Sequence, residues 1–421
     1  MNTPTGPGVV IVGAGQAGAT CAALLRRHGY DRPVTLVGDE DTAPYHRPPL
    51  SKKWLAGGSD DELPLRAETF YRDQDITLLT STRVTAVALA DRRVLLTDGS
   101  ALPYEHLVLA TGVSARRLPV PGADLNGVHH LRDRRDAAAL RQDLARSERL
   151  VVIGGGYLGL EAAATARGLG VDVEVVEGSE RLLSRVASAP VSDAVARLHR
   201  ENGVGLHTGA QVTRLRGAGG RVDGVELGDG RVIACDTVLV AVGAVPNDTL
   251  AREGGLACGG GIEVDAAGRT ADPAVYAIGD VTVRPVPGQP GRRRVESVAN
   301  ANEQADQVAA AVCGRPVPRQ SAPWFWSDQF DTKIQIVGMR GEEDTRVVRG
   351  DEATGSFAVF HLDGEGRLTS VEALASPREA MAGKRWLSQG ACPDPRELAA
   401  PEVALAKVRT EPVRSLDAVT A

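Results

Sequence analysis

The stretch VVIVGAGQAG, residues 9–18, runs from an apolar segment typical of a buried β-strand into a glycine-rich turn. Its glycines follow the spacing G-x-G-x-x-G at Gly13, Gly15 and Gly18, and a helical pattern continues through Arg27. In such a turn the first glycine permits the tight reversal from strand to helix. The second lets a pyrophosphate approach the backbone, and the third lets the helix pack closely on the strand. The N–H groups and the dipole at the helix N-terminus then favour the phosphate charge, so the stretch predicts a Rossmann-like dinucleotide-binding fold.

A second strand follows the helix at residues 34–40 and completes this unit. Asp39 lies near its end, where a carboxylate can bind a ribose hydroxyl. Because strand, turn, helix and second strand come in the required order, the glycine spacing is a specific signal here. We expect Ala14, inside the turn, to contact the same phosphates.

The same pattern recurs at LVVIGGGYLG, residues 150–159. Gly154, Gly156 and Gly159 occupy the three glycine positions, and helical spacing follows again. Two phosphate-binding turns in one chain predict two bound dinucleotides. A flavin and a nicotinamide together would convert hydride donation into electron transfer, whereas two nicotinamides would accomplish little.

The strand DVEVVE, residues 172–177, follows the second turn and its helix and ends at Glu177. An acidic group at this position binds the 2′-OH of the adenosine ribose and repels a 2′-phosphate. The second site is therefore expected to prefer NADH over NADPH. Arg181 and Arg185 lie nearby in the sequence, and either could accommodate a 2′-phosphate or bind the pyrophosphate.

Composition and charge exclude several classes of protein. The chain has 421 residues, 43% of them apolar, which predicts two or three globular domains. The net charge of -6 argues against nucleic acid as the main partner. No secretory signal is recognised, and no apolar run reaches the ~18 residues of a membrane helix. We expect a cytoplasmic protein with no membrane partner, and its oligomeric state, monomer or dimer, stays open.

The five cysteines have no C-x-x-C or C-x-x-x-x-C spacing. Scattered cysteines of this kind are usually buried or free thiols, so no redox-active disulfide is expected. The eight histidines show no H-x-x-x-H or H-E-x-x-H spacing, and no structural metal is expected.

Further motifs resemble those of the two-dinucleotide flavoprotein superfamily. They are Ala110-Thr111-Gly112 after an apolar strand, the segment 270–280 ending in Gly279-Asp280, and the segment 45–52. RPPLSK (47–52), GGGYLGLE (154–161), VESVANANEQA (295–305) and PWFWSDQ (323–329) narrow the resemblance. Together they resemble the NADH-dependent ferredoxin reductases of bacterial cytochrome P450 and dioxygenase systems. The resemblance covers roughly residues 8–400 and implies FAD as the flavin.

The resemblance also implies roles for individual residues. Lys52 would lie near the flavin edge, where a cation stabilises the anionic reduced ring. Glu161 would hold the nicotinamide carboxamide, with possible help from Glu296, and Trp326 would pack beside the isoalloxazine. The remaining FAD contacts would be Arg47 with the phosphates, Asp280 with the ribityl chain, Val84 near adenine, Val298 near the pyrimidine side of the ring, Arg132 from the domain hinge, and Thr111, Gly112 and Gly279 from the two strand ends. Gly243 would end a comparable strand near the second cofactor.

The expected fold class is α/β, with two nested Rossmann-like dinucleotide-binding domains and a C-terminal α+β domain. The FAD domain would be discontinuous, with residues 1–112 and 244–320, and the NAD domain would occupy 113–243. Residues 321–421 would form the third domain. Within it, residues 333–338, 355–362 and 367–374 read as antiparallel strands, and helical spacing follows around residues 377–389. A further helix and a loose end are expected after residue 391.

Without a cysteine pair, the predicted electron acceptor is a separate one-electron carrier such as a [2Fe–2S] ferredoxin. An NADH oxidase or peroxidase and a disulfide reductase are the alternatives, but both usually need a redox cysteine, and TAPYHRPP (42–49) has none. A redox-sensing flavoprotein of the apoptosis-inducing-factor type also stays open. Ferredoxins are usually acidic, so Arg292, Arg293 and Arg294, with Arg284 nearby, are candidates for docking. The alternative is that these arginines only form a solvated loop.

Overall fold

The computed structural model describes residues 7–411 of the chain. Two compact units form within them. Unit 1 consists of residues 7–47, 59–114 and 244–323, and unit 2 consists of residues 48–58, 115–243 and 324–411. Each unit therefore contains one of the two glycine-rich turns.

A seven-stranded sheet forms the centre of unit 1. Its strands follow the order β3-β2-β1-β6-β5-β4, and β18 also pairs with β6. The pairs among β1, β2, β3, β6 and β18 are parallel, whereas β5 pairs antiparallel with both β4 and β6. The bounds are β1 (Gly8–Val12), β2 (Val34–Val37), β3 (Ile76–Leu79), β4 (Val84–Ala88), β5 (Arg93–Leu96), β6 (Ala101–Leu109) and β18 (Val275–Ala277).

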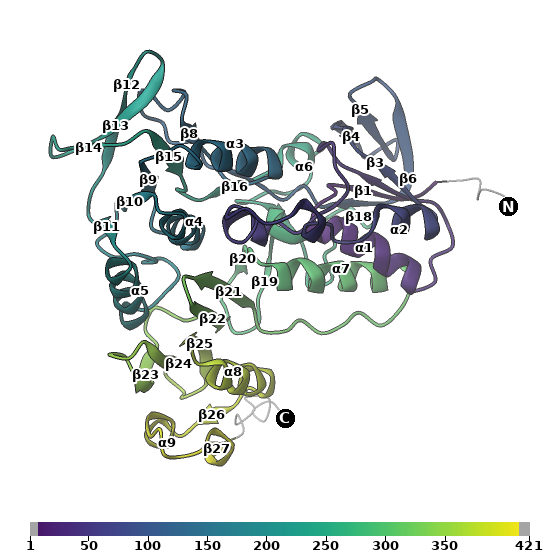
Figure 1. Cartoon of the computed structure of the whole chain (residues 1–421). Helices are drawn as coiled ribbons and strands as arrows, with labels where there is room; N and C mark the ends of the chain where they lie inside the picture. The colour runs from purple at the N-terminus through teal and green to yellow at the C-terminus, as the bar shows by residue number, and fades with distance from the viewer. Residues whose placement is uncertain (1–6, 412–421) are drawn as a thin grey trace. The chain divides into compact units, whose positions relative to one another are not determined.

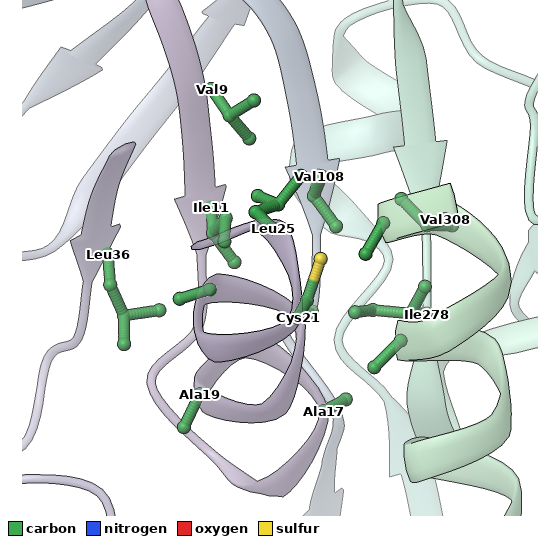
Figure 2. Close-up of a cluster of buried hydrophobic side chains, with 14 of the residues drawn as sticks. Val9, Ile11, Ala17, Ala19, Cys21, Leu25, Leu36, Val108, Ile278 and Val308 are labelled. Carbon is green, nitrogen blue, oxygen red and sulfur yellow. The ribbon is translucent and has the colours of Figure 1, made fainter. Parts of the chain in front are cut away.

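Two helices cover one face of this sheet, α1 (Gln16–Arg27) and α7 (Val298–Val312), and they also pack against each other (Figure 1). β1 is buried along its whole length, as expected of a parallel strand with both faces covered. Figure 2 shows Ile11 of β1, Cys21 of α1 and Val308 of α7 within the resulting apolar cluster. This packing fixes the start of α1, and with it the first glycine turn, to the end of β1.

The other elements of unit 1 are short helices and strands. They are η2 (Asp60–Glu62), α2 (Glu68–Asp73), β7 (Val113–Ala115), β16 (Ala244–Pro246), α6 (Thr249–Glu253), β17 (Ile262–Glu263), η3 (Gly279–Val281), β19 (Thr282–Pro285) and β20 (Arg292–Arg293). β7 pairs with β16, and β17, β19 and β20 form a small sheet in that order.

Unit 2 contains a second parallel sheet, with the order β11-β10-β9-β15-β8, and an antiparallel sheet, β12-β13-β14. Helix α4 follows β9 and packs against β9 and β10, which repeats the arrangement of the first turn. The bounds are η1 (Pro48–Ser51), β8 (Val128–His129), α3 (Arg134–Leu144), β9 (Arg149–Ile153), α4 (Tyr157–Gly168), β10 (Asp172–Val176), α5 (Ala189–Glu201), β11 (Val204–His207), β12 (Val212–Ala218), β13 (Arg221–Leu227), β14 (Val232–Ala234) and β15 (Thr237–Val240).

The C-terminal part of unit 2 is an antiparallel sheet with the order β21-β22-β25-β24-β23, against which α8 packs. The three strands and the helix predicted between residues 333 and 389 are confirmed, as is a helix after residue 391. The predicted loose end lies largely outside the described residues. The bounds are β21 (Trp324–Gln329), β22 (Thr332–Gly338), β23 (Thr345–Asp351), β24 (Ser356–Leu362), β25 (Leu368–Leu374), α8 (Pro377–Gln389), β26 (Cys392–Pro393), α9 (Pro395–Ala399), η4 (Leu405–Lys407) and β27 (Thr410–Glu411).

The predicted α/β class, with two Rossmann-like folds and a C-terminal α+β part, is confirmed. Its division into three cofactor-defined domains stays a prediction. One segment differs from it, because residues 48–58 belong to unit 2 although the sequence placed them with the first domain. Thr165 of α4 donates to the carbonyl oxygen of Ser51 at 2.8 Å, and Arg141 of α3 donates to the carbonyl of Trp54 at 3.3 Å. These contacts attach the segment to two helices of unit 2.

Within residues 7–411, no helix combines the length and the apolar character that a membrane crossing requires. The same residues hold no cluster of three His, Cys, Asp or Glu side chains arranged to bind a metal ion.

Candidate functional site

The first glycine turn, in unit 1, gives its three glycines different tasks. Gly13 has φ 113°, and a Cβ there would lie 2.1 Å from the carbonyl oxygen of Ala110. A Cβ on Gly18 would lie 2.0 Å from the carbonyl oxygen of Gly13. At Gly15, by contrast, a Cβ would meet no atom within 4 Å. The outer glycines are therefore required by packing, whereas the middle one keeps the backbone approachable from the side that a pyrophosphate would use.

The helix that follows this turn begins without a side-chain cap, because Gly15 is its N-cap residue. Its first N–H groups are therefore available to a phosphate. Ala14 lies against Gly38 at the end of β2, since a Cβ on Gly38 would come within 2.6 Å of the Ala14 Cβ. The turn thus has the shape and the donors that a dinucleotide pyrophosphate requires.

The segment that ends in Gly279-Asp280 contacts the first glycine turn. The amide of Gly279 donates to Oε1 of the buried Gln304 at 2.8 Å, and a Cβ on Gly279 would lie 3.1 Å from the Cβ of Ala17 in α1. Asp280, the next residue, is therefore carried to the start of α1. Thr111 and Asn247 exchange hydrogen bonds of 2.8 and 2.9 Å, which hold the strand end that includes Gly112.

Two charged residues of unit 1 that were predicted to contact FAD interact with other side chains of the protein. Arg47 donates to Glu40 at 2.5 Å, and Tyr45 donates to the same carboxylate at 2.5 Å. The Arg47 guanidinium also lies 5.2 Å from the centre of the Tyr45 ring. Asp39 forms an exposed ion pair of 2.9 Å with Arg83. Their predicted contacts with FAD phosphate and ribose stay predictions.

The remaining unit 1 residues lie at strand and helix starts. Val84 is the buried first residue of β4, and Val298 is the first residue of α7. Ser297 caps that helix by accepting from the amide of Asn300. Glu296 is exposed, and its carboxylate forms an ion pair of 2.8 Å with Arg294.

The second glycine turn, in unit 2, repeats the geometry of the first. A Cβ on Gly154 would lie 2.4 Å from the carbonyl oxygen of Ala241, and one on Gly159 would lie 2.3 Å from the carbonyl oxygen of Gly154. A Cβ on Gly156 would meet nothing within 4 Å, and Gly156 is the uncapped N-cap of α4. The second turn is therefore built for the same kind of ligand.

Glu177 lies against this second turn, as its place after β10 predicted. Its two carboxylate oxygens accept hydrogen bonds from the amides of Gly155 and Ser179, both at 2.7 Å. Of the two arginines that left the choice of cofactor open, Arg181 donates to Ser192 at 2.6 Å. Arg185 lies beside Gly243, where a Cβ would come 3.8 Å from its Nη2 atom. A carboxylate held by two backbone amides therefore lies where the sequence predicted ribose recognition, which stays a prediction.

A buried carboxylate cluster surrounds Glu161 of α4, also in unit 2. Its Oε2 atom lies 2.5 Å from Nζ of Lys52 and accepts from the Ser51 hydroxyl at 2.6 Å. Its Oε1 atom accepts from the Ser327 hydroxyl at 2.6 Å. Only 5% of Glu161 is exposed, and a buried carboxylate needs this full set of partners. The predicted Lys52 and Glu161 are thus one ion pair.

Aromatic residues pack together at β21 and at the start of α4, the elements that carry Ser327 and Glu161. Trp326 stacks on Trp324 with ring centres 5.2 Å apart, and the first residue of α4, Tyr157, packs on Phe325 at 4.6 Å. Burial raises the pKa of Tyr157, and the nearby carboxylates of Glu372 and Glu161 add to this. Arg132 precedes α3, and its amide donates to Asp136 at 2.9 Å.

The structure excludes Arg284 from an exposed docking surface, whereas docking through Arg292, Arg293 and Arg294 stays a prediction. Arg284 is not exposed: 3% of its side chain is accessible, and it donates to Asn300, Glu303 and Gln307. Arg292 and Arg293 form β20 rather than a loop, and Arg292 forms an ion pair with Glu263 at 3.3 Å. Within residues 7–411, no carboxylate forms an ion pair with Arg293. Arg292 and Arg294 each form an ion pair with a glutamate, so residues 292–294 and these partners carry less net positive charge than three unpaired arginines would.

All five cysteines are free thiols. Burial raises the pKa of both Cys21 and Cys235 to about 12. Burial also raises the pKa of the other three, so none of the five has the lowered pKa of a reactive thiol.

Several functional candidates were missed by the sequence analysis. Ser51 and Ser327 lie inside the quoted motifs RPPLSK and PWFWSDQ, but their partner Glu161 is distant in sequence. Gln16 donates to Asn302 at 2.8 Å and so joins α1 to α7 beside the first turn. His199 and Gln329, described below, gave no pattern at all, because a lone polar residue on an amphipathic element has no diagnostic spacing.

Comparison with known proteins agrees with this geometry. Residues 7–305 match the family model described as pyridine nucleotide-disulphide oxidoreductase, and residues 324–409 match one described as reductase C-terminal. The chain is 45% identical over 397 residues to a probable ferredoxin reductase of Castellaniella defragrans, covering 94% of this chain and 97% of that protein. It is 44% identical over 381 residues to the rhodocoxin reductase of Rhodococcus erythropolis, covering 90% and 89%.

Among solved structures, the chain resembles one chain of the covalent complex of putidaredoxin reductase with putidaredoxin. The TM-score is 0.92 with 39% sequence identity, and the match covers 95% of this chain and 97% of that one.

Proposed function

The chain belongs to the pyridine nucleotide-disulphide oxidoreductase family, and within it to the ferredoxin reductases, and we propose that it uses FAD to pass electrons from NADH to a [2Fe–2S] ferredoxin. That ferredoxin would in turn serve a cytochrome P450 or another oxygenase. The main observation behind this proposal is the pair of glycine turns. In each turn the middle glycine is approachable, while the outer glycines are packed against backbone oxygens. One chain with two such turns is built to hold two dinucleotides.

The turn in unit 1 would hold FAD. The N-terminus of α1 would bind the pyrophosphate, and Asp280, fixed beside it through Gly279, would hydrogen-bond the ribityl chain. Arg47 would add positive charge near the phosphates while its other face stays on Glu40 and Tyr45. A bound flavin takes two electrons from a nicotinamide and can give them up singly.

The turn in unit 2 would hold NADH. Glu177 is already fixed by two backbone amides, so it would accept from the ribose 2′-OH without having to reorganise. A 2′-phosphate at the same place would meet a fixed negative charge, which supports NADH over NADPH. Glu161 would hold the nicotinamide carboxamide, and the paired Lys52 would keep the local charge balanced.

The absence of a cysteine pair supports a one-electron acceptor. Many members of a disulphide oxidoreductase family need a dithiol, but the five thiols here are free and have raised pKa values. The electrons would therefore leave for a separate protein. The solved relative that was crystallised covalently joined to putidaredoxin supports a ferredoxin as that protein.

The test combines cofactor identification with acceptor dependence. We expect one FAD per chain to be released on denaturation, and we expect NADH to reduce cytochrome c rapidly only when a [2Fe–2S] ferredoxin is added. FMN or no flavin would contradict the cofactor assignment. Rapid oxygen consumption with NADH alone, unaffected by ferredoxin, would favour an NADH oxidase instead.

A further inference from the structure

A chain of buried hydrogen bonds leads from Glu161 into the core of unit 2. The Ser327 hydroxyl donates to Glu161, and Nε2 of Gln329 donates to the same hydroxyl oxygen at 3.1 Å. Oε1 of Gln329 lies 2.9 Å from Nε2 of His199 on α5. Ser327, Gln329 and His199 each have 0% exposure. Polar side chains are costly in such a position unless all of them are hydrogen-bonded in a consistent order.

The donors and acceptors along this chain allow only one direction for every bond, so each end of the chain constrains the other. The Glu161 carboxylate, which is paired with Lys52, accepts from the Ser327 hydroxyl, and this bond uses the single proton of Ser327. The Ser327 oxygen must then accept from the NH₂ group of Gln329, which turns the Gln329 carbonyl towards His199. His199 must therefore carry a proton on Nε2. The four side chains fit one arrangement, and the opposite Gln329 orientation would leave Glu161 facing a hydroxyl lone pair.

The surroundings of His199 hold it in that state. Its Nδ1 atom is buried and has no hydrogen-bond partner, so a second ring proton would have no acceptor. Burial also lowers the pKa of His199, which favours the neutral imidazole. The Phe330 ring packs edge-on against it, with ring centres 5.1 Å apart and planes at 68°.

Phe330 itself has a strained backbone. Its φ is 53°, in the left-handed region that bulky residues rarely adopt, and it lies in the two-residue connection between β21 and β22. Strain of this kind persists only where the surroundings over-determine the conformation, and it often marks functional sites. Here the strained residue follows Gln329 directly and places its ring on His199. The turn therefore fixes both partners at the far end of the chain.

We propose that His199 is a positioning residue that orients the Glu161 carboxylate through Gln329 and Ser327. The inference rests on the proposed role of Glu161 in holding the nicotinamide carboxamide. His199 touches neither cofactor in this account. Its function is to fix which way the Gln329 amide points, and thereby which oxygen of Glu161 is occupied by Ser327 and which stays with Ser51 and Lys52.

The test compares two ligands of the FAD-loaded protein by calorimetry. NAD⁺ contains the nicotinamide that Glu161 would hold, whereas ADP-ribose lacks it. We expect His199→Phe to raise the Kd for NAD⁺ about fivefold, the value of one hydrogen bond, and to leave the Kd for ADP-ribose within about twofold. His199→Gln, whose side-chain N–H can still donate to Gln329, should restore NAD⁺ binding to within about twofold of the wild type.

Val195→Ala is the matched control. Val195 lies on the same helix with 0% exposure but takes no part in the hydrogen-bonded chain. This variant should lower Tm while the ratio of the two Kd values stays that of the wild type. If His199→Phe behaves like Val195→Ala, or weakens both ligands equally, the positioning role is wrong and His199 is only core packing.

A double-mutant cycle separates this inference from the proposed function. Glu161→Ala should itself weaken NAD⁺ relative to ADP-ribose, and adding His199→Phe should then have no further effect. If Glu161→Ala leaves the ratio unchanged, the proposed role of Glu161 falls, and the positioning role falls with it. If Glu161→Ala shifts the ratio but His199→Phe does not, the positioning role alone is refuted.

A spectroscopic measurement keeps the proposal testable even if a variant fails to fold. In the ¹⁵N NMR spectrum of the wild-type protein, His199 should appear as a neutral imidazole with its proton on Nε2. A proton on Nδ1, or a charged ring at neutral pH, would reverse the deduced bond directions and overturn the proposal.

Discussion

Alanine placed at two glycines of the second turn should have opposite consequences. Gly156→Ala introduces a methyl group that meets no protein atom within 4 Å, and the Gly156 backbone, with φ -83° and ψ 175°, is one that alanine adopts readily. The remaining cost is the poorer N-cap, about 1 kcal/mol or less. Gly159→Ala introduces a methyl group 2.3 Å from the carbonyl oxygen of Gly154 and 3.1 Å from a methyl of Val152. Overpacking of this kind costs about 1–3 kcal/mol or more.

The expected outcome is a separation of ligand binding from stability. At about 2–4 °C per kcal/mol, Gly159→Ala should lower Tm by roughly 2–12 °C, and Gly156→Ala by less than about 4 °C. In the folded protein, Gly156→Ala should weaken NAD⁺ at least about tenfold, because the methyl group occupies the side from which the pyrophosphate approaches.

Differential scanning fluorimetry and calorimetric titration with NAD⁺ measure the two effects. The same substitution in the first turn, Gly15→Ala, is the matched control, and it should reduce FAD retention without changing NAD⁺ affinity in the molecules that keep flavin. Unchanged NAD⁺ binding by Gly156→Ala, in a protein of normal Tm, would refute the assignment of the second turn.

Four further outcomes are expected. NADH should exceed NADPH at least about tenfold in kcat/KM, or about 1.4 kcal/mol, and Glu177→Ala should narrow that ratio; equal use of both cofactors by the wild type would contradict the role of the carboxylate. Replacing all five cysteines by alanine or serine should leave ferredoxin reduction largely intact in the folded protein, whereas one cysteine whose loss stops turnover with FAD still bound would require a thiol mechanism. Arg293→Glu should raise the KM for ferredoxin, and flatten the salt dependence of that KM, more than Arg292→Glu does, because Arg292 is already paired with Glu263. Reduction of ferricyanide by NADH is the control, and an equal loss of ferricyanide reduction would place these arginines at the flavin site instead. Because burial lowers the folded-state pKa of His199 below its usual value of about 6.5, protonation favours the unfolded chain, and the free energy of unfolding should fall as pH drops below about 6.5. Measured by chemical denaturation, the free energy of unfolding of His199→Gln should fall less steeply with acid than that of the wild type. If the two proteins lose stability in parallel, this histidine does not contribute to the acid dependence.

The sequence was sufficient for the parts of the fold that depend on local pattern. Both glycine turns, the strands beside them and three strands of the C-terminal sheet were predicted, because each combines an apolar run with turn residues at fixed offsets. β23 was not recognised as a strand, since charged residues interrupt its apolar pattern. One of them, Arg349, is buried and donates to carbonyl oxygens of the C-terminal segment at Leu398 and Ala400.

The sequence proposed residues for the candidate site but did not show which of them contact one another. Lys52 and Glu161 were identified separately from motifs, and nothing in their spacing showed that they form one ion pair. His199 and Gln329 lie 130 positions apart, and only the folding of β21 near α5 brings them together. Exposure was also misjudged at Arg284, because a basic residue near a glycine-rich stretch looks like surface until its buried partners are known.

The most direct test of the central claim is an anaerobic two-step reduction followed in the visible spectrum of the flavin. We expect NADH to bleach the flavin of the purified protein, and we expect oxidised [2Fe–2S] ferredoxin, added next without oxygen, to restore its colour as two ferredoxin molecules are reduced per flavin. A flavin that NADH does not bleach, or a reduced flavin that ferredoxin leaves unchanged while oxygen restores its colour at once, would contradict the account.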